Sequence, residues 1–82
     1  MKEEKVIMEK LGQILIKEFG KMNINYDTTL NGDNKNCLDL NSLEIVKLIV
    51  EIENTFNIII DFDVRFNSIG DIIKYIILQE SI

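Results

Sequence analysis

Apolar residues recur at intervals of three and four along the first quarter of the chain. They are Ile7, Met8, Leu11, Ile14, Leu15 and Phe19. This spacing places them on one face and predicts an amphipathic helix over residues 3–19. Glu3 and Glu4 lie in its first turn and Lys17 lies in its last, so both ends complement the helix dipole. Gly20 follows as the residue that stops the helix.

A second helix is predicted to begin at Ser42 and to run to about Asn54. Asn41 precedes it as a good N-cap, because its side chain can accept a hydrogen bond from a free backbone N–H of the first turn. Glu44, three residues after Asn41, completes a capping box in which each side chain satisfies the backbone N–H of the other residue. The start of this helix is therefore well defined by the sequence.

The second helix carries two apolar stripes. One stripe is wide enough to pack the helix against a core, and it consists of Ile45, Leu48, Ile49, Ile52 and Phe56. The other is rotated away from that face and forms an apolar ridge of Leu43, Val46 and Val50. Its charged flanks are Glu44, Lys47, Glu51 and Glu53. An exposed ridge with such flanks is typical of a protein-docking surface. The alternative is a central helix that buries most of its circumference, and periodicity alone does not decide between the two.

The segment from Lys21 to about Leu40 shows no periodicity and is predicted to be a long loop. Asn, Asp, Thr and Gly dominate it, around the isolated apolar residues Ile24, Tyr26, Leu30, Leu38 and Leu40. A connection of about 20 residues is uncommon in a compact domain. We therefore expect the loop to pack through its apolar residues or to serve a function.

The last part of the chain is predicted to hold one short and one longer helix. Three consecutive β-branched residues, Ile58–Ile60, are compatible with a strand, but no second strand is available to pair with it. We expect an extended stretch there, then a short helical turn at about 62–66. Ser68 caps a final helix with Asp71 at its N3 position. Its apolar stripe is Ile69, Ile72, Ile73 and Ile76. The predicted fold is all-α, a small four-helix bundle of three main helices and one short helix.

Composition narrows the class of protein. Apolar residues make up 46% of the chain and charged residues 28%, which is the balance of a globular protein. A chain of 82 residues suffices for a single domain, 1–82. No apolar run approaches the roughly 20 residues that cross a bilayer. The sequence MKEEK at residues 1–5 is unlike a signal peptide, so we expect a cytoplasmic protein without membrane insertion.

Missing residue types exclude several chemistries. The chain has no histidine and one cysteine, so Ser-His-Asp and Cys-His catalysis and Cys/His zinc sites lack their base or ligands. A net charge of −5 argues against nucleic acid and favours partners with basic surfaces. No histidine and no cluster of bases near Cys37 is visible that could activate its thiol, and we interpret it as inert and partly buried. The scattered acidic residues indicate a solvated surface, not a metal site or catalytic carboxylates.

Ser42 is a candidate for chemistry because of its position. It lies in the first turn of the predicted helix, where free backbone N–H groups and the positive end of the helix dipole favour a phosphate on or near its hydroxyl. The alternative is an ordinary polar residue of a first turn. The local pattern leaves both interpretations open.

Four segments follow a known pattern. They are LDLNSLEIVKL at 38–48, EIENTF at 51–56, Ile58-x-Ile60, and SIGDIIKYI at 68–76. The pattern resembles the acyl carrier protein and peptidyl carrier protein family, in which a D-S-L-like motif opens a helix that ends in E-x-x-F or similar. The resemblance covers essentially the whole chain, and the order of helix, long loop, helix, short helix and helix agrees with it.

This resemblance implies a specific function. Ser42 would receive a 4′-phosphopantetheine arm from coenzyme A through a phosphodiester that a phosphopantetheinyl transferase installs, with Asn41 capping the helix beside it. The arm's terminal thiol would hold an acyl, aminoacyl or peptidyl group as a thioester. The protein would be a non-catalytic carrier, and we expect a monomer that serves the loading and synthase enzymes of a biosynthetic pathway. The residues at positions of partner contact are Leu43, Glu44, Val46, Lys47 and Val50.

The chain also departs from the family pattern. Asn41 stands where the family usually has aspartate, Lys47 where fatty-acid carriers usually have an acid, and Asp61 where a proline is common. The stretch between Leu30 and Ser42 is longer than usual. These departures favour a specialised, stand-alone carrier over the housekeeping fatty-acid carrier. The alternative function is a carrier-like helical adaptor that binds partners without the prosthetic group. The cargo, whether fatty acyl, polyketide, amino acid or D-alanyl, is left open.

Overall fold

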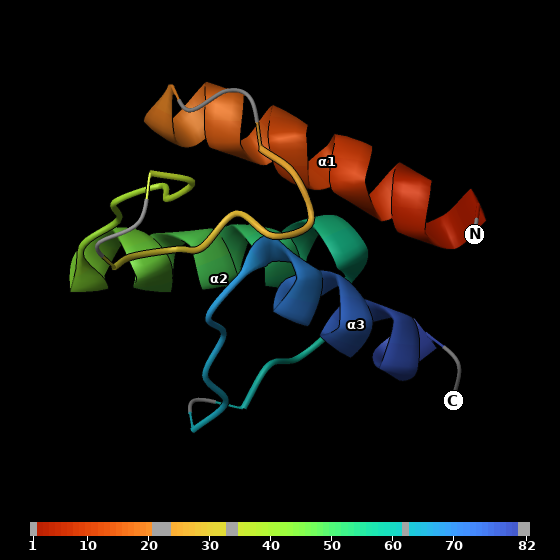
Figure 1. Cartoon of the computed structure of the whole chain (residues 1–82). Coiled ribbons are helices and arrows are strands. Elements are labelled where there is room, and N and C mark those ends of the chain that lie inside the picture. Colours follow the sequence, from red (N-terminus) through yellow and green to blue (C-terminus); the bar gives the residue numbers. More distant parts are fainter. Residues whose placement is uncertain (1, 21–23, 33–34, 62, 81–82) are drawn as a thin grey trace.

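Three helices form where the hydrophobic spacing predicts them. The computed structural model describes residues 2–20, 24–32, 35–61 and 63–80. The helices are α1 (Lys2–Phe19), α2 (Ser42–Phe56) and α3 (Ile69–Glu80). α1 packs against both α2 and α3, and α1 and α2 run in opposite directions (Figure 1). Within the described ranges there is no β-strand, and the predicted all-α class is confirmed.

The core lies where the apolar faces of the three helices meet the long loop. Burial of these side chains provides the main favourable contribution to folding. The buried apolar residues are Ile7, Leu11, Ile14, Leu15, Leu30, Leu38, Leu40, Leu48, Ile52, Ile60, Ile69, Ile72, Ile73 and Ile76. Leu30, Leu38 and Leu40 belong to the loop, so the expectation that the loop packs through its apolar residues is confirmed.

The ends of α1 and α2 follow local backbone rules. Gly20 ends α1 with a left-handed φ of 66°, and its N–H donates to the Ile16 carbonyl at 3.0 Å. α2 continues to Phe56, two residues beyond the predicted end at Asn54. Asn57 takes the left-handed conformation at its C-cap, which asparagine tolerates better than most residues. Asparagine at this position is a weaker sequence signal for the end of a helix than glycine would be.

The long loop holds the first turns of α2 and α3 in place. Residue Leu30 donates its N–H to the Asn67 carbonyl at 3.0 Å, and its own carbonyl accepts from the Leu40 N–H at 2.9 Å. Isolated β-bridges join Thr29 to Cys37 on one side and to Ser68 on the other. The segment at 28–30 therefore lies between the residues that lead into the two helices.

A buried threonine fixes this loop from within. Thr28 is almost completely buried, and its hydroxyl donates to Asn36 Oδ1 at 2.8 Å. The same hydroxyl accepts from the Asn25 backbone N–H at 2.8 Å. Because a buried hydroxyl is costly without partners, these bonds are part of what stabilises the loop.

The start of α3 and the segment before it are only partly as predicted. The Ser68 hydroxyl accepts from the Asp71 N–H at 3.3 Å, and Asp71 Oδ2 accepts from the Ser68 N–H at 3.2 Å, so the predicted cap is confirmed. The short helical turn predicted at 62–66 includes residue 62, which lies outside the described residues. In the described part, the Val64 N–H donates to the Asp61 carbonyl at 3.1 Å, which closes one turn and not a helix.

No helix in the described part of the chain is both long and apolar enough to cross a membrane.

Candidate functional site

Ser42 is an exposed first residue of α2, directly after its N-cap. Asn41 Oδ1 accepts from the Glu44 N–H at 2.9 Å, and Glu44 Oε1 accepts from the Asn41 N–H at 3.0 Å. This is the predicted capping box, and it is confirmed. The two bonds fix the backbone on both sides of Ser42 while the hydroxyl itself faces solvent.

The electrostatics at this helix end suit a phosphate on the Ser42 hydroxyl. The first backbone N–H groups of a helix have no acceptor within the helix and give its N-terminus a partial positive charge. The Asn41 side chain takes up one of these donors, the Glu44 N–H, at 2.9 Å, and the Asn41 carbonyl accepts the first intrahelical bond from the Ile45 N–H at 2.9 Å. The hydroxyl of Ser42 is a primary alcohol, which is the kind of nucleophile that can form a phosphodiester. The residues present therefore fit a phosphate-linked group.

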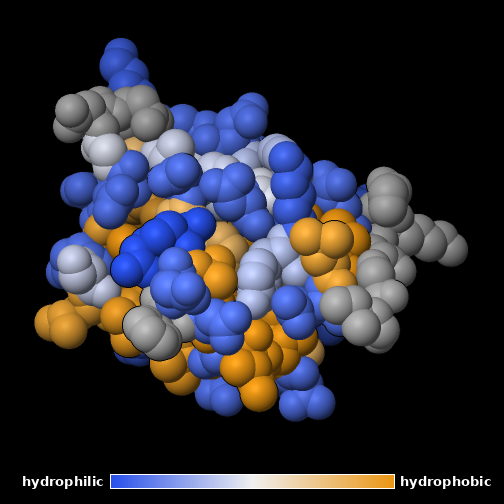
Figure 2. Space-filling view, turned by 90° about the horizontal axis from the view of Figure 1, so that it is seen from below, coloured by the Kyte–Doolittle hydropathy of each residue, from blue (hydrophilic) through white to orange (hydrophobic). Residues whose placement is uncertain are grey.

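The apolar ridge of α2 is exposed. Leu43 has 82% of its surface accessible, Val46 58% and Val50 46%. Of the other stripe, Leu48 and Ile52 are fully buried. The alternative of a helix buried around most of its circumference is thus excluded. The space-filling view from below Figure 1 shows apolar side chains reaching the surface in several patches between hydrophilic ones (Figure 2).

Three of the four charged residues that flank the apolar ridge contact other parts of the molecule. Lys47 Nζ lies 3.0 Å from Glu18 Oε1 and 5.8 Å from the centre of the Phe19 ring, both at the end of α1. Glu44 closes the capping box, and Glu53 Oε2 accepts from the Ile60 N–H at 2.8 Å. The sequence pattern did not reveal the Lys47 contact, because helical spacing says nothing about which helix lies opposite.

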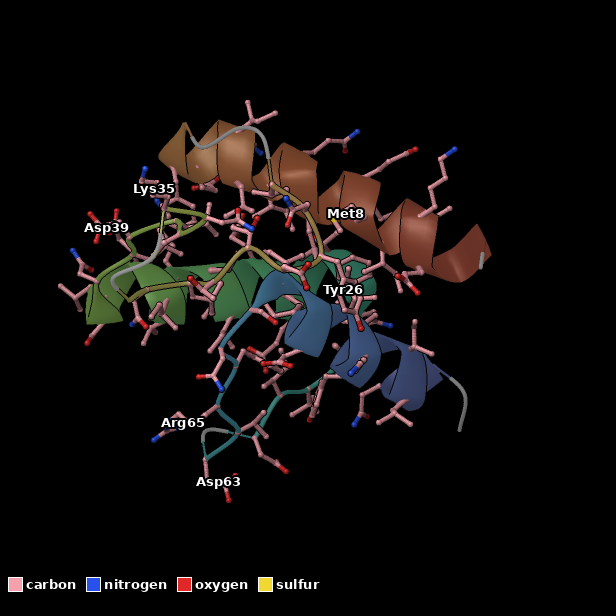
Figure 3. The ribbon with its side chains drawn as sticks, in the orientation of Figure 1. Met8, Tyr26, Lys35, Asp39, Asp63 and Arg65 are labelled. Atoms are coloured by element: carbon pink, nitrogen blue, oxygen red, sulfur yellow. The ribbon has the colours of Figure 1, made fainter. Side chains whose placement is uncertain are left out.

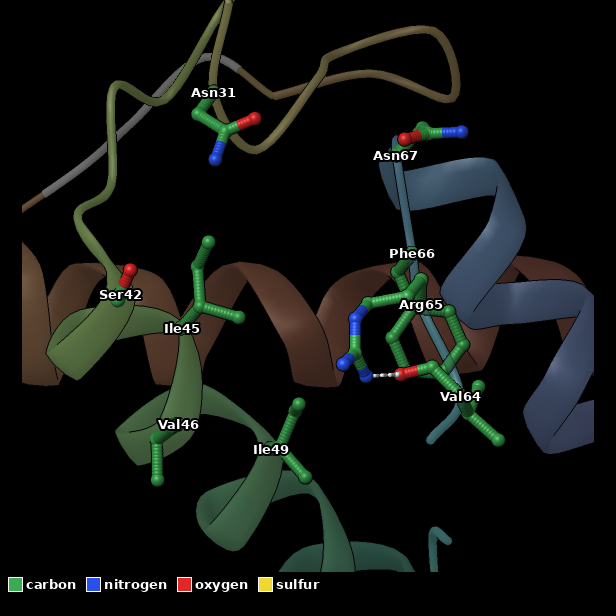
Figure 4. Close-up of a pocket in the computed structure, with 9 residues that line it drawn as sticks. All are labelled: Asn31, Ser42, Ile45, Val46, Ile49, Val64, Arg65, Phe66 and Asn67. Carbon is green, nitrogen blue, oxygen red and sulfur yellow. Dashed lines mark hydrogen bonds between the residues drawn. The ribbon is translucent and has the colours of Figure 1, made fainter. Parts of the chain in front are cut away.

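A groove opens beside Ser42, between α2 and the segment at 63–67 (Figure 4). Its volume is about 580 Å³. It is lined by Asn31, Ser42, Ile45, Val46, Ile49, Val64, Arg65, Phe66 and Asn67. Ile45 and Ile49, which were assigned to the core face, are only half-buried because the groove lies over them. The sequence pattern did not predict the groove, although Val64 and Phe66 alternate with polar residues in a segment that has no helical period.

Cys37 is partly buried in the loop, as predicted. Its Sγ accepts from the Asp39 N–H at 3.2 Å and lies 3.8 Å from the Gly32 carbonyl oxygen, to which it donates. In the part of the chain that the structure describes, no group of three or more acidic or cysteine side chains is arranged to hold a metal ion.

Replacing Asn41 tests the role of the cap. We expect Asn41→Ala to lower the free energy of unfolding by about 1 kcal/mol, because the Glu44 N–H loses its acceptor. Asn41→Asp keeps the acceptor and adds a negative charge at the helix N-terminus, so it should stabilise by about 0.3–1 kcal/mol at low salt. Urea denaturation of the three proteins measures both effects. Equal stability of the wild type and Asn41→Ala would contradict the assigned cap.

Comparison with known proteins agrees with this arrangement. The family described as "Phosphopantetheine attachment site" matches residues 25–76. The "Acyl carrier protein" of Streptococcus pyogenes serotype M1 is 32% identical over 72 residues, which cover 85% of this chain and 90% of that protein. The values for the "Acyl carrier protein" of Streptococcus thermophilus strain CNRZ 1066 are the same. No solved structure matches the chain. The chain belongs to the acyl carrier protein family, whose prosthetic group is a covalently attached 4′-phosphopantetheine.

Proposed function

We propose that Ser42 carries the 4′-phosphopantetheine arm and that the protein shuttles acyl groups between the enzymes of a biosynthetic pathway. The observation that carries this proposal is the position of Ser42. Its side chain is exposed at the capped first turn of α2, next to Leu43 of the apolar ridge, and it lines the groove together with Val46 of the same ridge. One residue thus adjoins a surface for partner enzymes and a recess for cargo.

Different residues of the chain act in attachment of the arm and in docking to partner enzymes. Ser42 Oγ forms a bond to phosphorus while the pyrophosphate P–O bond of coenzyme A breaks. Adenosine bisphosphate leaves, and the transferase takes up the serine proton. The first backbone N–H groups of α2 then stabilise the phosphodiester charge. When bound, the arm supplies a thiol that holds the cargo as a thioester. Leu43, Val46 and Val50 bury apolar surface against the partner enzymes during each transfer.

Two observations favour acyl over peptidyl cargo. The curated relatives bear the name "Acyl carrier protein". The groove beside Ser42 has apolar walls from Ile45, Ile49 and Phe66, which suit an alkyl chain better than a peptide backbone.

The departures at Asn41 and Lys47 support a specialised carrier. Asn41 removes a charge from the attachment site, and Lys47 forms an ion pair with Glu18 in place of an exposed acid. We further propose that the chain is a single cytoplasmic domain, 1–82, that acts as a monomer. Its partners are a phosphopantetheinyl transferase and loading and synthase enzymes whose docking surfaces are basic, to match the net charge of −5.

Intact-mass measurement tests the proposal. The apo protein is incubated with coenzyme A and a broad-specificity phosphopantetheinyl transferase. We expect the wild type to gain the mass of one phosphopantetheine, and Ser42→Ala to gain none. Ser68→Ala is the matched control, because Ser68 also lies at the start of a helix, and it should load like the wild type.

A wild type that stays unmodified with several transferases would overturn the proposal. The alternative of a helical adaptor without the arm would then account for the exposed ridge.

A further inference from the structure

The lining of the groove beside Ser42 includes an asparagine that is followed by a glycine, Asn31 and Gly32. Both residues are exposed, and Figure 4 shows the Asn31 side chain directed from its loop toward the groove. Gly32 has a φ of 131°, a conformation that L side chains rarely adopt, so the bend itself requires glycine at this position. The residue after Asn31 therefore has no side chain to shield its backbone nitrogen.

This pair of residues permits a reaction between side chain and backbone. When the Gly32 N–H loses its proton to water or hydroxide, its nitrogen can attack Cγ of the Asn31 amide. The N–Cγ bond forms, the Cγ–Nδ2 bond breaks, and ammonia leaves with a proton from solvent, which closes a cyclic succinimide. Water then adds to either carbonyl of the ring and opens it, so the products are aspartate and isoaspartate. Asparagine counts among the thermolabile residues.

Hydrogen bonds oppose the same reaction at the two asparagines that are followed by serine, Asn41 and Asn67. Asn41 Oδ1 accepts from the Glu44 N–H at 2.9 Å, so attack there would require the side chain to leave the helix cap. The nitrogen after Asn67 is that of Ser68, whose N–H donates to Asp71 Oδ2 at 3.2 Å. The negative charge of this carboxylate also opposes loss of the Ser68 proton.

Asn31 lacks such protection in the part of the chain that the structure describes. Within those residues, no hydrogen bond engages the Asn31 side chain or the Gly32 N–H. Asn31 is also the only asparagine of the chain that is followed by glycine. The attacking nitrogen and its target are thus neighbours in an exposed bend, and no hydrogen bond among the described residues has to break before they meet.

We propose that Asn31 is a site of spontaneous deamidation, which converts a neutral amide in the lining of the groove into a carboxylate. Among the described residues that line the groove none is acidic, so the product brings a negative charge to a surface that it shares with Ser42. The isoaspartate product also adds a methylene to the main chain of the loop that leads to α2.

The consequence for loading rests on the proposed attachment at Ser42. A carboxylate at position 31 repels the phosphates of coenzyme A as they approach the serine. We therefore expect Asn31→Asp to lower the kcat/KM of a phosphopantetheinyl transferase by about twofold to fivefold, the range for exposed charges. Asn31→Gln keeps a neutral amide and should load like the wild type. Equal kcat/KM values for all three proteins would show that this charge does not act on loading.

Peptide mapping of the folded apo protein over time tests the proposed site. Mass spectrometry follows the change from amide to acid at each asparagine, and methylation by an isoaspartyl methyltransferase measures isoaspartate. We expect Asn31 to convert at least about tenfold faster than Asn67, since breaking a hydrogen bond to a charged group slows a reaction by about that factor. Its rate should rise with pH, because the attacking nitrogen must lose a proton. Asn31→Gln should remove most of the isoaspartate, because its attack closes a larger ring.

Unfolding the protein in guanidinium chloride separates the effect of sequence from that of structure. Asn41 and Asn67 lose their protecting bonds there, so their conversion should accelerate by about tenfold, whereas that of Asn31 should change by less than about threefold. Conversion of Asn31 no faster than that of Asn67 in the folded protein, or an equal acceleration of both on unfolding, would overturn the proposal. Because the apo protein is used, the result is independent of whether Ser42 receives the arm.

Discussion

Leu43→Ala is expected to lower the kcat/KM of a phosphopantetheinyl transferase or loading enzyme acting on this carrier by about tenfold or more. Burying a leucine side chain fully is worth about 1.5–3 kcal/mol, and each 1.4 kcal/mol is a factor of ten. Leu43 has 82% of its surface exposed and lies next to Ser42, so an enzyme that reaches the hydroxyl must cover it. Steady-state kinetics with increasing carrier concentration measure the effect.

The chain supplies a matched control for this prediction. Ile59 is another large aliphatic residue with 81% of its surface exposed, but it follows α2 and lies outside the apolar ridge. Ile59→Ala should leave kcat/KM within about twofold of the wild type, and both variants should keep their stability within about 0.5 kcal/mol, as surface substitutions do. Equal kcat/KM values for the two variants would show that the apolar ridge does not contribute to docking.

Gly70→Ala is expected to lower the free energy of unfolding by about 1–3 kcal/mol, the range for overpacking a close-packed site. A Cβ at this position would lie within 3.0 Å of the Tyr26 ring. The Gly70 N–H also donates to the Tyr26 carbonyl at 2.8 Å, which holds the loop against α3 and leaves the ring little room to retreat. Figure 3 shows Tyr26 beside this helix. Thermal or urea denaturation measures the loss.

The same substitution at Gly12 is the control. Gly12 lies inside α1, and nothing lies within 4 Å of the place where its Cβ would be. Gly12→Ala should therefore stabilise by about 0.5–1 kcal/mol, because alanine favours the helix more than glycine does. A destabilised Gly12→Ala, or a Gly70→Ala as stable as the wild type, would show that close approach to Tyr26 is not what requires glycine.

Features set by neighbouring residues were predicted from the sequence. The caps at Asn41 and Ser68 depend on a residue three positions further on, so the local pattern contains all their information. The stop at Gly20 is local in the same way. The apolar ridge was identified from the sequence as a stripe. Whether it is exposed depends on how many other elements pack against α2, and the sequence pattern does not specify that packing.

Features that join distant segments were not predicted. The ion pair of Lys47 with Glu18 links residues of two helices, and no periodicity specifies their approach. The groove lies between α2 and residues 63–67, and no local pattern specifies how far apart these two segments lie. Of the short helix predicted at 62–66, the described residues 63–66 form no helix, and Phe66 packs edge to face on Tyr75 of α3 instead. Tertiary contacts override local propensity in such short pieces.

Attachment of the arm to Ser42 is the claim on which the rest depends. Fragmentation of the loaded, intact protein in a mass spectrometer locates the added group directly. The account predicts one phosphopantetheine per chain, on the fragment that contains Ser42, and none on Ser42→Ala. A group located on any other residue, or a wild type that gains none with several transferases, would contradict it.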